Sequence, residues 1–307
     1  MKTDELTPAP PRVVPPVRDE EPRAAVPLVQ RRSWRWSVIG IYSLMVLLTI
    51  PFLFPSWWMI TSSFKPLSQV LEFPPTLWPR EFTLDAYRAV FEQPFVQQYF
   101  NSMYIAIAVT IGTMIISAMA GYAFARIRFP GVNAIFLLIL VGLMLPTEVT
   151  IIPLFQLFNG VGLTDTHWPL VIMPMFGASA VMGTFVMRQF FLGLPRELED
   201  AGFVDGLTRF GVFRRIALPI AKPSLAAVAI LSFLASWNAY LEPLVFLSSK
   251  SMFTLPLALT QYTDSTGIPL WNVQQAAATM TVLPVLLVFI FAQRHFVQGL
   301  SQSGIKG

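Results

Sequence analysis

The chain has 307 residues, of which 54% are hydrophobic and only 12% are charged, whereas soluble globular proteins carry about 25% charged residues. So few charges could not cover the apolar surface of a soluble fold of this length, so a soluble protein is excluded and an integral membrane protein is predicted. Cysteine is absent, which excludes disulfides and thiol catalysis. His167 and His295 are the only histidines, too few for a histidine-based metal centre, so no metal site is expected.

Residues 1–35 differ in composition from the rest of the chain. They contain seven prolines, mixed charges and almost no bulky apolar residues. Such a segment cannot bury enough surface to offset the entropy of ordering, so a disordered cytoplasmic tail is predicted. The first apolar run after it is expected to remain in the mature protein as a membrane anchor.

From residue 36 onward, long uncharged stretches alternate with short charged ones. Each long stretch supplies the roughly 20 residues that cross about 30 Å of hydrocarbon. The sequence therefore predicts an all-α membrane protein with a six-helix domain over residues 36–307. The six predicted spans lie within residues 36–64, 93–125, 129–158, 166–187, 223–249 and 265–293.

The basic residues orient these spans. With the tail inside, all of the 21 Lys and Arg residues face the cytoplasm except Lys65, Arg80, Arg88 and Lys250. Both termini are therefore predicted to be cytoplasmic, in a multi-pass protein of the cell membrane. Since the net charge of +4 is explained by topology, no nucleic-acid partner is expected.

Two connections are long. Residues 65–98 are predicted outside, as a small cap with a helix near 83–91. Residues 188–222 (the 188–222 loop) are predicted inside, with one short helix after Pro195 and a second that Pro219 stops. Acidic residues crowd the start of the first helix, and Gly206 follows where a left-handed residue suits its end. From physics alone, this loop is either a knob that binds a partner or a surface hairpin that only joins two spans.

The 188–222 loop resembles the coupling motif of ATP-binding-cassette (ABC) importer permeases, which reads Glu-Ala-Ala, three residues, Gly, nine residues, Ile, one residue, Leu-Pro. Two positions depart from it, Asp for Glu at 200 and Gly for Ala at 202. Further segments resemble the second permease of maltose-type and glycerol-3-phosphate-type importers, in the carbohydrate-uptake branch. They include Leu145-Pro146, Ile152-Pro153, Arg188-Gln189-Phe190-Phe191, Trp237-Asn238 and the stretch from Gln293 to Gly299.

The resemblance implies a transporter subunit, not an enzyme, that moves a sugar or sugar derivative such as an oligosaccharide or a glycerol-3-phosphate-like solute. It implies as partners a homologous second permease, two cytoplasmic ATPases and an extracytoplasmic solute-binding protein, besides membrane lipid. ATP and Mg are expected in the ATPases, because this chain lacks the G-x-x-x-x-G-K-[ST] phosphate loop. The residues expected to couple to an ATPase are Glu197, Glu199, Asp200, Ala201, Gly202, Asp205, Gly206, Ile216, Leu218 and Pro219.

Two acids lie at membrane depth, Glu148 and Glu242. Intramembrane carboxylates are costly and suggest function. Since Asn238 is four residues before Glu242, one helical face is expected to carry both beside Trp237, as a polar stripe along the solute path. The alternative is that these groups only form interhelical hydrogen bonds or lie near the membrane interface.

Two other classes of protein fit the composition. A secondary transporter or channel driven by an ion gradient is compatible with six spans and two buried acids, but it does not explain the 188–222 loop, and the two halves show no repeat. A membrane enzyme would need catalytic polar residues clustered at one interface. The two histidines are instead predicted on opposite sides.

Overall fold

The computed structural model describes residues 31–303, and within that range the secondary structure is helical apart from one isolated bridge between Thr263 and Pro269. The predicted 1–35 tail therefore lies largely outside the described residues. The chain up to Leu53 and the chain from Phe54 onward are two units, each considered by itself. The described part of the first unit is one apolar helical stretch, the beginning of α1.

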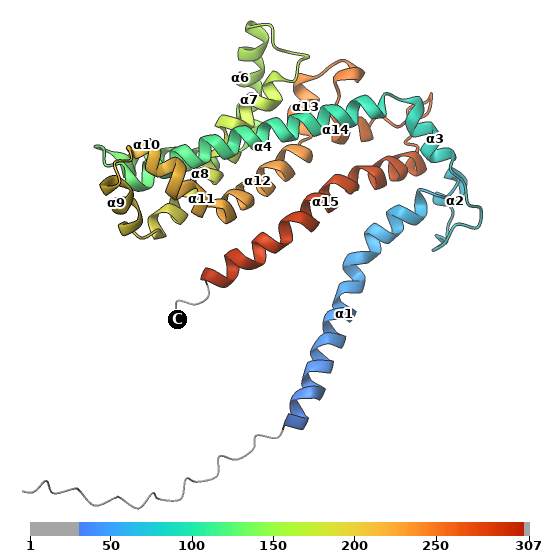
Figure 1. Cartoon of the computed structure of the whole chain (residues 1–307). Coiled ribbons are helices and arrows are strands. Elements are labelled where there is room, and N and C mark those ends of the chain that lie inside the picture. Colours follow the sequence, from blue (N-terminus) through green and yellow to red (C-terminus); the bar gives the residue numbers. More distant parts are fainter. Residues whose placement is uncertain (1–30, 304–307) are drawn as a thin grey trace, which may run out of the picture. The chain divides into compact units, whose positions relative to one another are not determined.

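The helices of Figure 1 are, in chain order, α1 (Arg31–Ser62), α2 (Leu67–Val70), α3 (Asp85–Glu92), α4 (Phe95–Arg126), α5 (Val132–Val141), η1 (Gly142–Met144), α6 (Thr147–Gly160), α7 (Trp168–Phe176), α8 (Ala178–Gly193), α9 (Glu197–Val204), α10 (Arg209–Val212), η2 (Phe213–Ala217), α11 (Leu218–Ile220), α12 (Lys222–Trp237), α13 (Leu241–Phe246), η3 (Lys250–Met252), α14 (Leu255–Leu259) and α15 (Trp271–Ser303). The helix predicted near residues 83–91 is confirmed by α3.

Four helical segments are long and apolar enough to cross a membrane: Val38–Ser62, Phe95–Arg126, Trp168–Gly193 and Trp271–Ile290. Two further pairs qualify only if each bent pair is one span. These pairs are Val132–Met144 with Thr147–Gly160, bent by 98°, and Arg209–Ile220 with Lys222–Trp237, bent by 77°. The structure therefore contains four to six candidate spans.

The bend between η1 and α6 follows from Leu145-Pro146. A residue before proline is pushed out of the helical region by the proline ring, and Leu145 has an extended ψ of 118°. Pro146 is extended as well, with ψ 138°, and α6 starts at Thr147. The predicted span 129–158 is consequently two helices that meet at a sharp angle.

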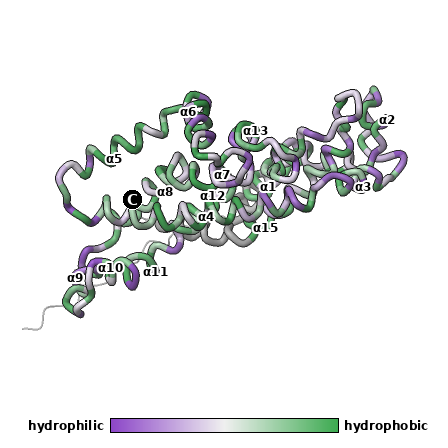
Figure 2. The backbone as a smooth tube through the Cα atoms, turned by 90° about the horizontal axis from the view of Figure 1, so that it is seen from above, coloured by the Kyte–Doolittle hydropathy of each residue, from purple (hydrophilic) through white to green (hydrophobic). Residues whose placement is uncertain are grey.

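In the second unit, α4 packs against α7, α8 and α12, and α12 packs in turn against α15. Close approach of α4 and α8 depends on Gly121, where an added Cβ would lie 2.5 Å from the Met187 Cβ and 2.9 Å from the Arg188 backbone nitrogen. The Ser117 hydroxyl also donates across the interface to the Ala180 carbonyl, at 3.2 Å. Hydrophobic residues run along most of α5, whereas hydrophilic residues colour the segments around α2 and α9–α11 (Figure 2).

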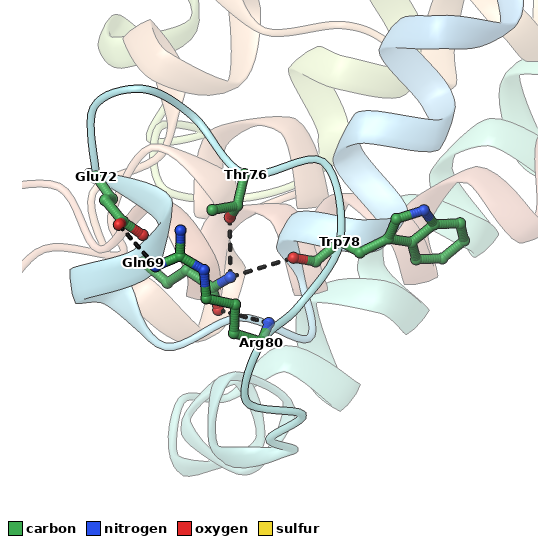
Figure 3. Close-up of polar contacts among 5 residues, drawn as sticks. All are labelled: Gln69, Glu72, Thr76, Trp78 and Arg80. Carbon is green, nitrogen blue, oxygen red and sulfur yellow. Dashed lines mark hydrogen bonds and ion pairs between the residues drawn. The ribbon is translucent and has the colours of Figure 1, made fainter.

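The segment between α1 and α3 is organised by the side chain of Gln69 (Figure 3). Its Nε2 donates to Thr76 Oγ1 at 2.8 Å and to the Trp78 carbonyl at 3.2 Å, and its Oε1 accepts from the Arg80 backbone N–H at 3.2 Å. Arg80 also pairs with Glu72, at 2.8 Å. Lys65 is fully buried beneath the segment, where its Nζ donates to the Thr76 carbonyl. A single amide therefore organises a loop that has little regular structure.

The N-terminal end of α4 carries polar side chains that are buried, Gln98, Asn101 and Ser102. They bond the backbone of residues 248–255 (the 248–255 segment), which contains only the short helix η3. Gln98 Nε2 donates to the Lys250 carbonyl (3.2 Å), Asn101 Nδ2 donates to the carbonyls of Ser251 (2.8 Å) and Phe253 (3.0 Å), and Ser102 Oγ accepts from the Leu255 N–H (2.7 Å). The carbonyls of Ser251 and Phe253 and the Leu255 N–H thereby gain partners that no helix or strand provides, whereas the Lys250 carbonyl also accepts from the Phe253 N–H at 3.4 Å.

The loop before α7 binds the same segment. Asp165 accepts from the backbone N–H groups of Ser248 and Ser249, both at 2.9 Å, and from the Ser249 hydroxyl at 2.5 Å. These bonds lower the pKa of the Asp165 carboxyl from its ordinary value. His167 Nε2 donates to the Met252 carbonyl at 2.6 Å. The 248–255 segment is thus held both by α4 and by the loop before α7.

Candidate functional site

The helical part of the 188–222 loop begins with α9. Glu197, Glu199 and Asp200 lie in its first turn, where negative charge complements the helix dipole. The helix ends in a Schellman motif: the Gly206 N–H donates to the Phe203 carbonyl and the Leu207 N–H to the Gly202 carbonyl, both at 3.0 Å. Gly206 has φ +82°, so the left-handed role predicted for it is confirmed.

After this turn, Thr208 caps the next helix, because its Oγ1 accepts from the Gly211 N–H at 3.1 Å. The prediction that Pro219 stops this helix is wrong. The chain continues through the π-helical turn η2 into α11, where Pro219 occupies the first turn and needs no N–H donor. The direction changes after Ile220, where α12 begins at an angle of 77°.

Glu199 turns inward, although it was predicted among the residues that meet an ATPase. Its Oε1 lies 3.1 Å from the Nε of Arg126, the last residue of α4, and the two side chains are only 9% and 6% exposed, respectively. The two atoms lack the alignment of a hydrogen bond, so the contact is a buried ion pair. Burial raises the pKa of the Glu199 carboxyl, and the charge of Arg126 opposes that rise.

Arg126 makes a second contact, because its Nη2 donates to the carbonyl of Leu194, the residue that follows α8. The surroundings are apolar and aromatic. The ring of Tyr122 lies edge-on to Phe191, with 5.3 Å between centroids, and 5.0 Å from Phe213. The guanidinium of Arg126, at the end of α4, thus contacts both the residue after α8 and the first turn of α9.

Gly202 is buried, although it was predicted among the residues that couple to an ATPase. A Cβ at Gly202 would lie 2.5 Å from Ile216 Cδ1 and 3.2 Å from Val212 Cγ2. Glycine at this motif position therefore permits α9 to pack on α10 and η2. Ile216 and Leu218 are both half-buried. Ile216 lies against Gly202, and Leu218 packs against the cluster that contains Tyr122 and Phe213, so both motif positions contribute to packing.

The outer face of the loop combines acids with apolar side chains. Of the predicted coupling residues, Glu197, Asp200, Ala201, Asp205, Gly206 and Pro219 are exposed. Sequence reasoning missed the large apolar residues exposed beside them, which are Leu198, Phe203, Val204 and Phe210. Val204 is 87% exposed. Apolar residues in a short charged loop were the available signal, since contiguous exposed apolar surface marks interaction sites.

The four residues predicted along the solute path do not form one polar stripe. α12 ends at Trp237, and α13 starts only at Leu241. Pro243 explains the break: it lacks the N–H that would bond the Ala239 carbonyl, and its ring disfavours a continuous helix there. Asn238 and Glu242 therefore do not share a helical face, which corrects the prediction.

Their individual surroundings also differ. Trp237 is 2% exposed and stacks on Phe233 at 5.6 Å between ring centroids, so it belongs to the core. Asn238 is exposed, and its side chain donates back to the Leu234 carbonyl at 2.8 Å. Glu148 is exposed in the first turn of α6, and Glu242 is half-buried in the first turn of α13. Trp237 therefore belongs to the core, whereas Asn238 and the two acids stay predictions for the path.

Comparison with known proteins gives the family. Residues 114–302 match the family described as binding-protein-dependent transport system inner membrane component. The arabinooligosaccharides transport system permease protein AraQ of Halalkalibacterium halodurans is 40% identical over 258 residues, which cover 83% of this chain and 91% of that protein. The sn-glycerol-3-phosphate transport system permease protein UgpE of Yersinia enterocolitica is 38% identical, over 68% of this chain and 74% of its own.

A solved structure supports the same fold. In the crystal structure of a bacterial ABC transporter involved in the import of the acidic polysaccharide alginate, one chain matches with a TM-score of 0.73 and 21% identity, covering 88% of this chain and 99% of that one. The helices described above thus have the arrangement of an ABC permease. The chain belongs to the family of binding-protein-dependent transport system inner membrane components, as a permease of an ABC transporter.

Proposed function

We propose that this permease is one membrane subunit of an ATP-driven importer that moves a sugar or sugar derivative across the cytoplasmic membrane. The carbohydrate class is supported by relatives named for arabinooligosaccharide and glycerol-3-phosphate transport. The observation that carries the coupling role is the exposed surface of α9 and of the turn after it, where acids lie among exposed apolar residues, with Phe210 of α10 exposed as well. A surface hairpin that only joins two spans would not need to expose Val204 and Phe210 to water.

The complete importer would contain a second, homologous permease, two ATPases that bind ATP and Mg, and an extracytoplasmic solute-binding protein. In this assembly the bent pair Val132–Met144 with Thr147–Gly160 forms one span and the helix α12 lies in another, which makes six, and both termini are cytoplasmic. The 248–255 segment and the segment between α1 and α3 then face outward, and α9 faces inward.

Coupling would work by rigid-body transmission. Closure of the ATPases on ATP moves the surface to which α9 is bound, and α9 passes the movement to α8 and α12, to which the loop is covalently joined. Asp200 and Asp205 supply charge-assisted hydrogen bonds to the ATPase, while the apolar side chains fill its cleft. Glu148 and Glu242, each in the first turn of a helix beside a break, are candidates to line the solute path, together with the exposed Asn238.

The alternative is transport driven by an ion gradient, and the energy source separates the two. The assembled transporter in proteoliposomes, with its binding protein and a labelled arabinooligosaccharide, is expected to accumulate sugar with ATP on the ATPase side and to continue when an uncoupler collapses the proton gradient. Uptake that follows the gradient and ignores ATP would overturn the proposal.

A further inference from the structure

The buried pair of Arg126 and Glu199 has no role in docking, because neither side chain is accessible. It is also costly. Burying two charges has an unfavourable desolvation free energy, which their mutual attraction offsets only while they stay in contact. Removing one partner leaves an uncompensated buried charge. The two charges therefore favour the relative position of α4 and α9 in which they remain together.

If only its chain connections held it, α9 could rotate relative to α8 and α12. Leu194 is extended with ψ 131°, Pro195 follows, and α9 begins only at Glu197, so a short non-helical link joins it to α8. On the other side, the chain bends by 77° between α11 and α12. A push on α9 could therefore be absorbed at these two joints.

Arg126 bridges the first of these joints. Its guanidinium contacts both Glu199 in α9 and the Leu194 carbonyl at the end of α8, while its backbone ends α4. Asp200 and Arg196 are the other charges that act on the Glu199 carboxyl, and both are exposed. Tyr122, one turn before Arg126 in α4, lies close to both charges, and its ring packs against Phe191 and Phe213. This apolar packing limits water at the pair and strengthens the attraction.

We propose that Arg126 and Glu199 are positioning residues that lock α9 to the ends of α4 and α8, so that displacement of α9 by an ATPase moves α4 as part of the same rigid body. This inference rests on the proposed function of the 188–222 loop. It adds a specific route, because α4 is the helix against which α7, α8 and α12 pack. With the pair intact, a movement of α9 is transmitted to α4 and to the helices packed against it.

The test uses the whole transporter with Glu199→Gln, which keeps the shape of the side chain and removes its charge. We expect the complex to assemble and to hydrolyse ATP, while the sugar transported per ATP falls about fivefold or more, the lower range of coupling effects. Arg188→Met is the matched control: Arg188 lies over the Phe136 ring and bonds Asn133 and the Phe124 carbonyl, away from α9. Its ratio of transport to ATP hydrolysis should stay unchanged.

A distance measurement gives a second readout, and it is simple because the chain has no cysteine. Spin labels on Met119→Cys in α4 and Arg196→Cys before α9 should report one distance, equal with and without a non-hydrolysable ATP analogue. With Glu199→Gln added, we expect a broadened distance that depends on the nucleotide. An unchanged distance, or transport and ATP hydrolysis falling in proportion, would overturn the lock, whereas failure of the unmutated complex to use ATP would overturn the proposed function instead.

Discussion

The two ends of α4 are held to their neighbours by different chemistry. At the N-terminal end, the amides of Gln98 and Asn101 and the hydroxyl of Ser102 bond the backbone of the 248–255 segment. At the C-terminal end, one buried ion pair holds α9, and one bond to the Leu194 carbonyl holds the end of α8. At the N-terminal end several neutral hydrogen bonds share the stabilisation, so losing one of them leaves the others in place. At the C-terminal end the ion pair depends on two charges, so losing either one leaves the other buried without a partner.

The two ends have different tasks in the proposed mechanism: one keeps an irregular segment in one conformation, and the other orients a helix. The 248–255 segment has no helical framework of its own beyond η3, so it requires many bonds to keep one conformation. The α9 helix is already ordered by its own bonds and only has to be oriented. The following changes, from the largest expected effect to the smallest, test this contrast.

Gly206→Asp is expected to abolish sugar uptake while the subunit still inserts into the membrane. A side chain at φ +82° strains the backbone and misdirects the outer face of α9. Gly131→Asp is the matched control, because Gly131 has φ +79° with equally open space but lies between α4 and α5. Uptake of labelled sugar and membrane content of the subunit are measured together. Normal uptake with Gly206→Asp would remove the coupling role from this loop.

Arg126→Met should lower the free energy of unfolding by about 3–5 kcal/mol at neutral pH, because it leaves the Glu199 carboxylate buried without a partner. The loss should depend on pH. Glu199 already has a raised pKa, and a raised carboxyl pKa stabilises the protonated folded state, so stability falls as pH increases above the ordinary value of 4.5. Without Arg126 the pKa of Glu199 rises further, so the loss of stability should grow between about pH 5 and about pH 7.

Thermal unfolding of the detergent-solubilised variant across this pH range measures the effect. The double variant with Glu199→Gln should recover part of the stability at about pH 7 and lose the pH dependence. A deficit that is the same at every pH would mean that Arg126 contributes through packing instead of charge.

Asn101→Ala should lower the free energy of unfolding by about 1–3 kcal/mol, since it leaves the buried Phe253 carbonyl and the partly buried bond to the Ser251 carbonyl without a donor. This is less than the loss at the other end, because Gln98 and Ser102 continue to hold the segment. Asn238→Ala serves as the control: that amide is exposed and bonds only its own helix, so the change should stay within about 0.5 kcal/mol. If Asn101→Ala matched Arg126→Met, the contrast between the two ends would be wrong.

Asp165→Ala should have the smallest effect, about 1 kcal/mol, from lost bonds to Ser248 and Ser249. The free energy of unfolding of Asp165→Asn should stay near that of the unmutated protein, because asparagine keeps an acceptor oxygen and tolerates the observed φ of +54°. Since the pKa of Asp165 is lowered, its contribution is present above the ordinary value of 3.8 and disappears as pH falls below it. A deficit of Asp165→Ala that persists at about pH 2.5 would contradict this assignment.

Much of the organisation was predictable from local composition. Apolar stretches of sufficient length located the helices, proline and acidic residues placed the start of α9, and the glycine at 206 marked its end. The motif in the 188–222 loop identified the family before any fold was known. These features depend on neighbours in the chain, so a single sequence reveals them.

The direction of each side chain was decided only by tertiary structure. Glu197, Glu199 and Asp200 read alike in sequence, yet only Glu199 faces Arg126, which is distant in the chain and buried at the end of α4. Likewise, Gly202 packs against Ile216 and Trp237 lies in the core because of residues that are distant from them in the chain. Hydropathy and spacing determine that a segment is helical and crosses the membrane. Which charge is removed from water depends on which groups the folded chain brings within a few ångströms, and no local pattern encodes that.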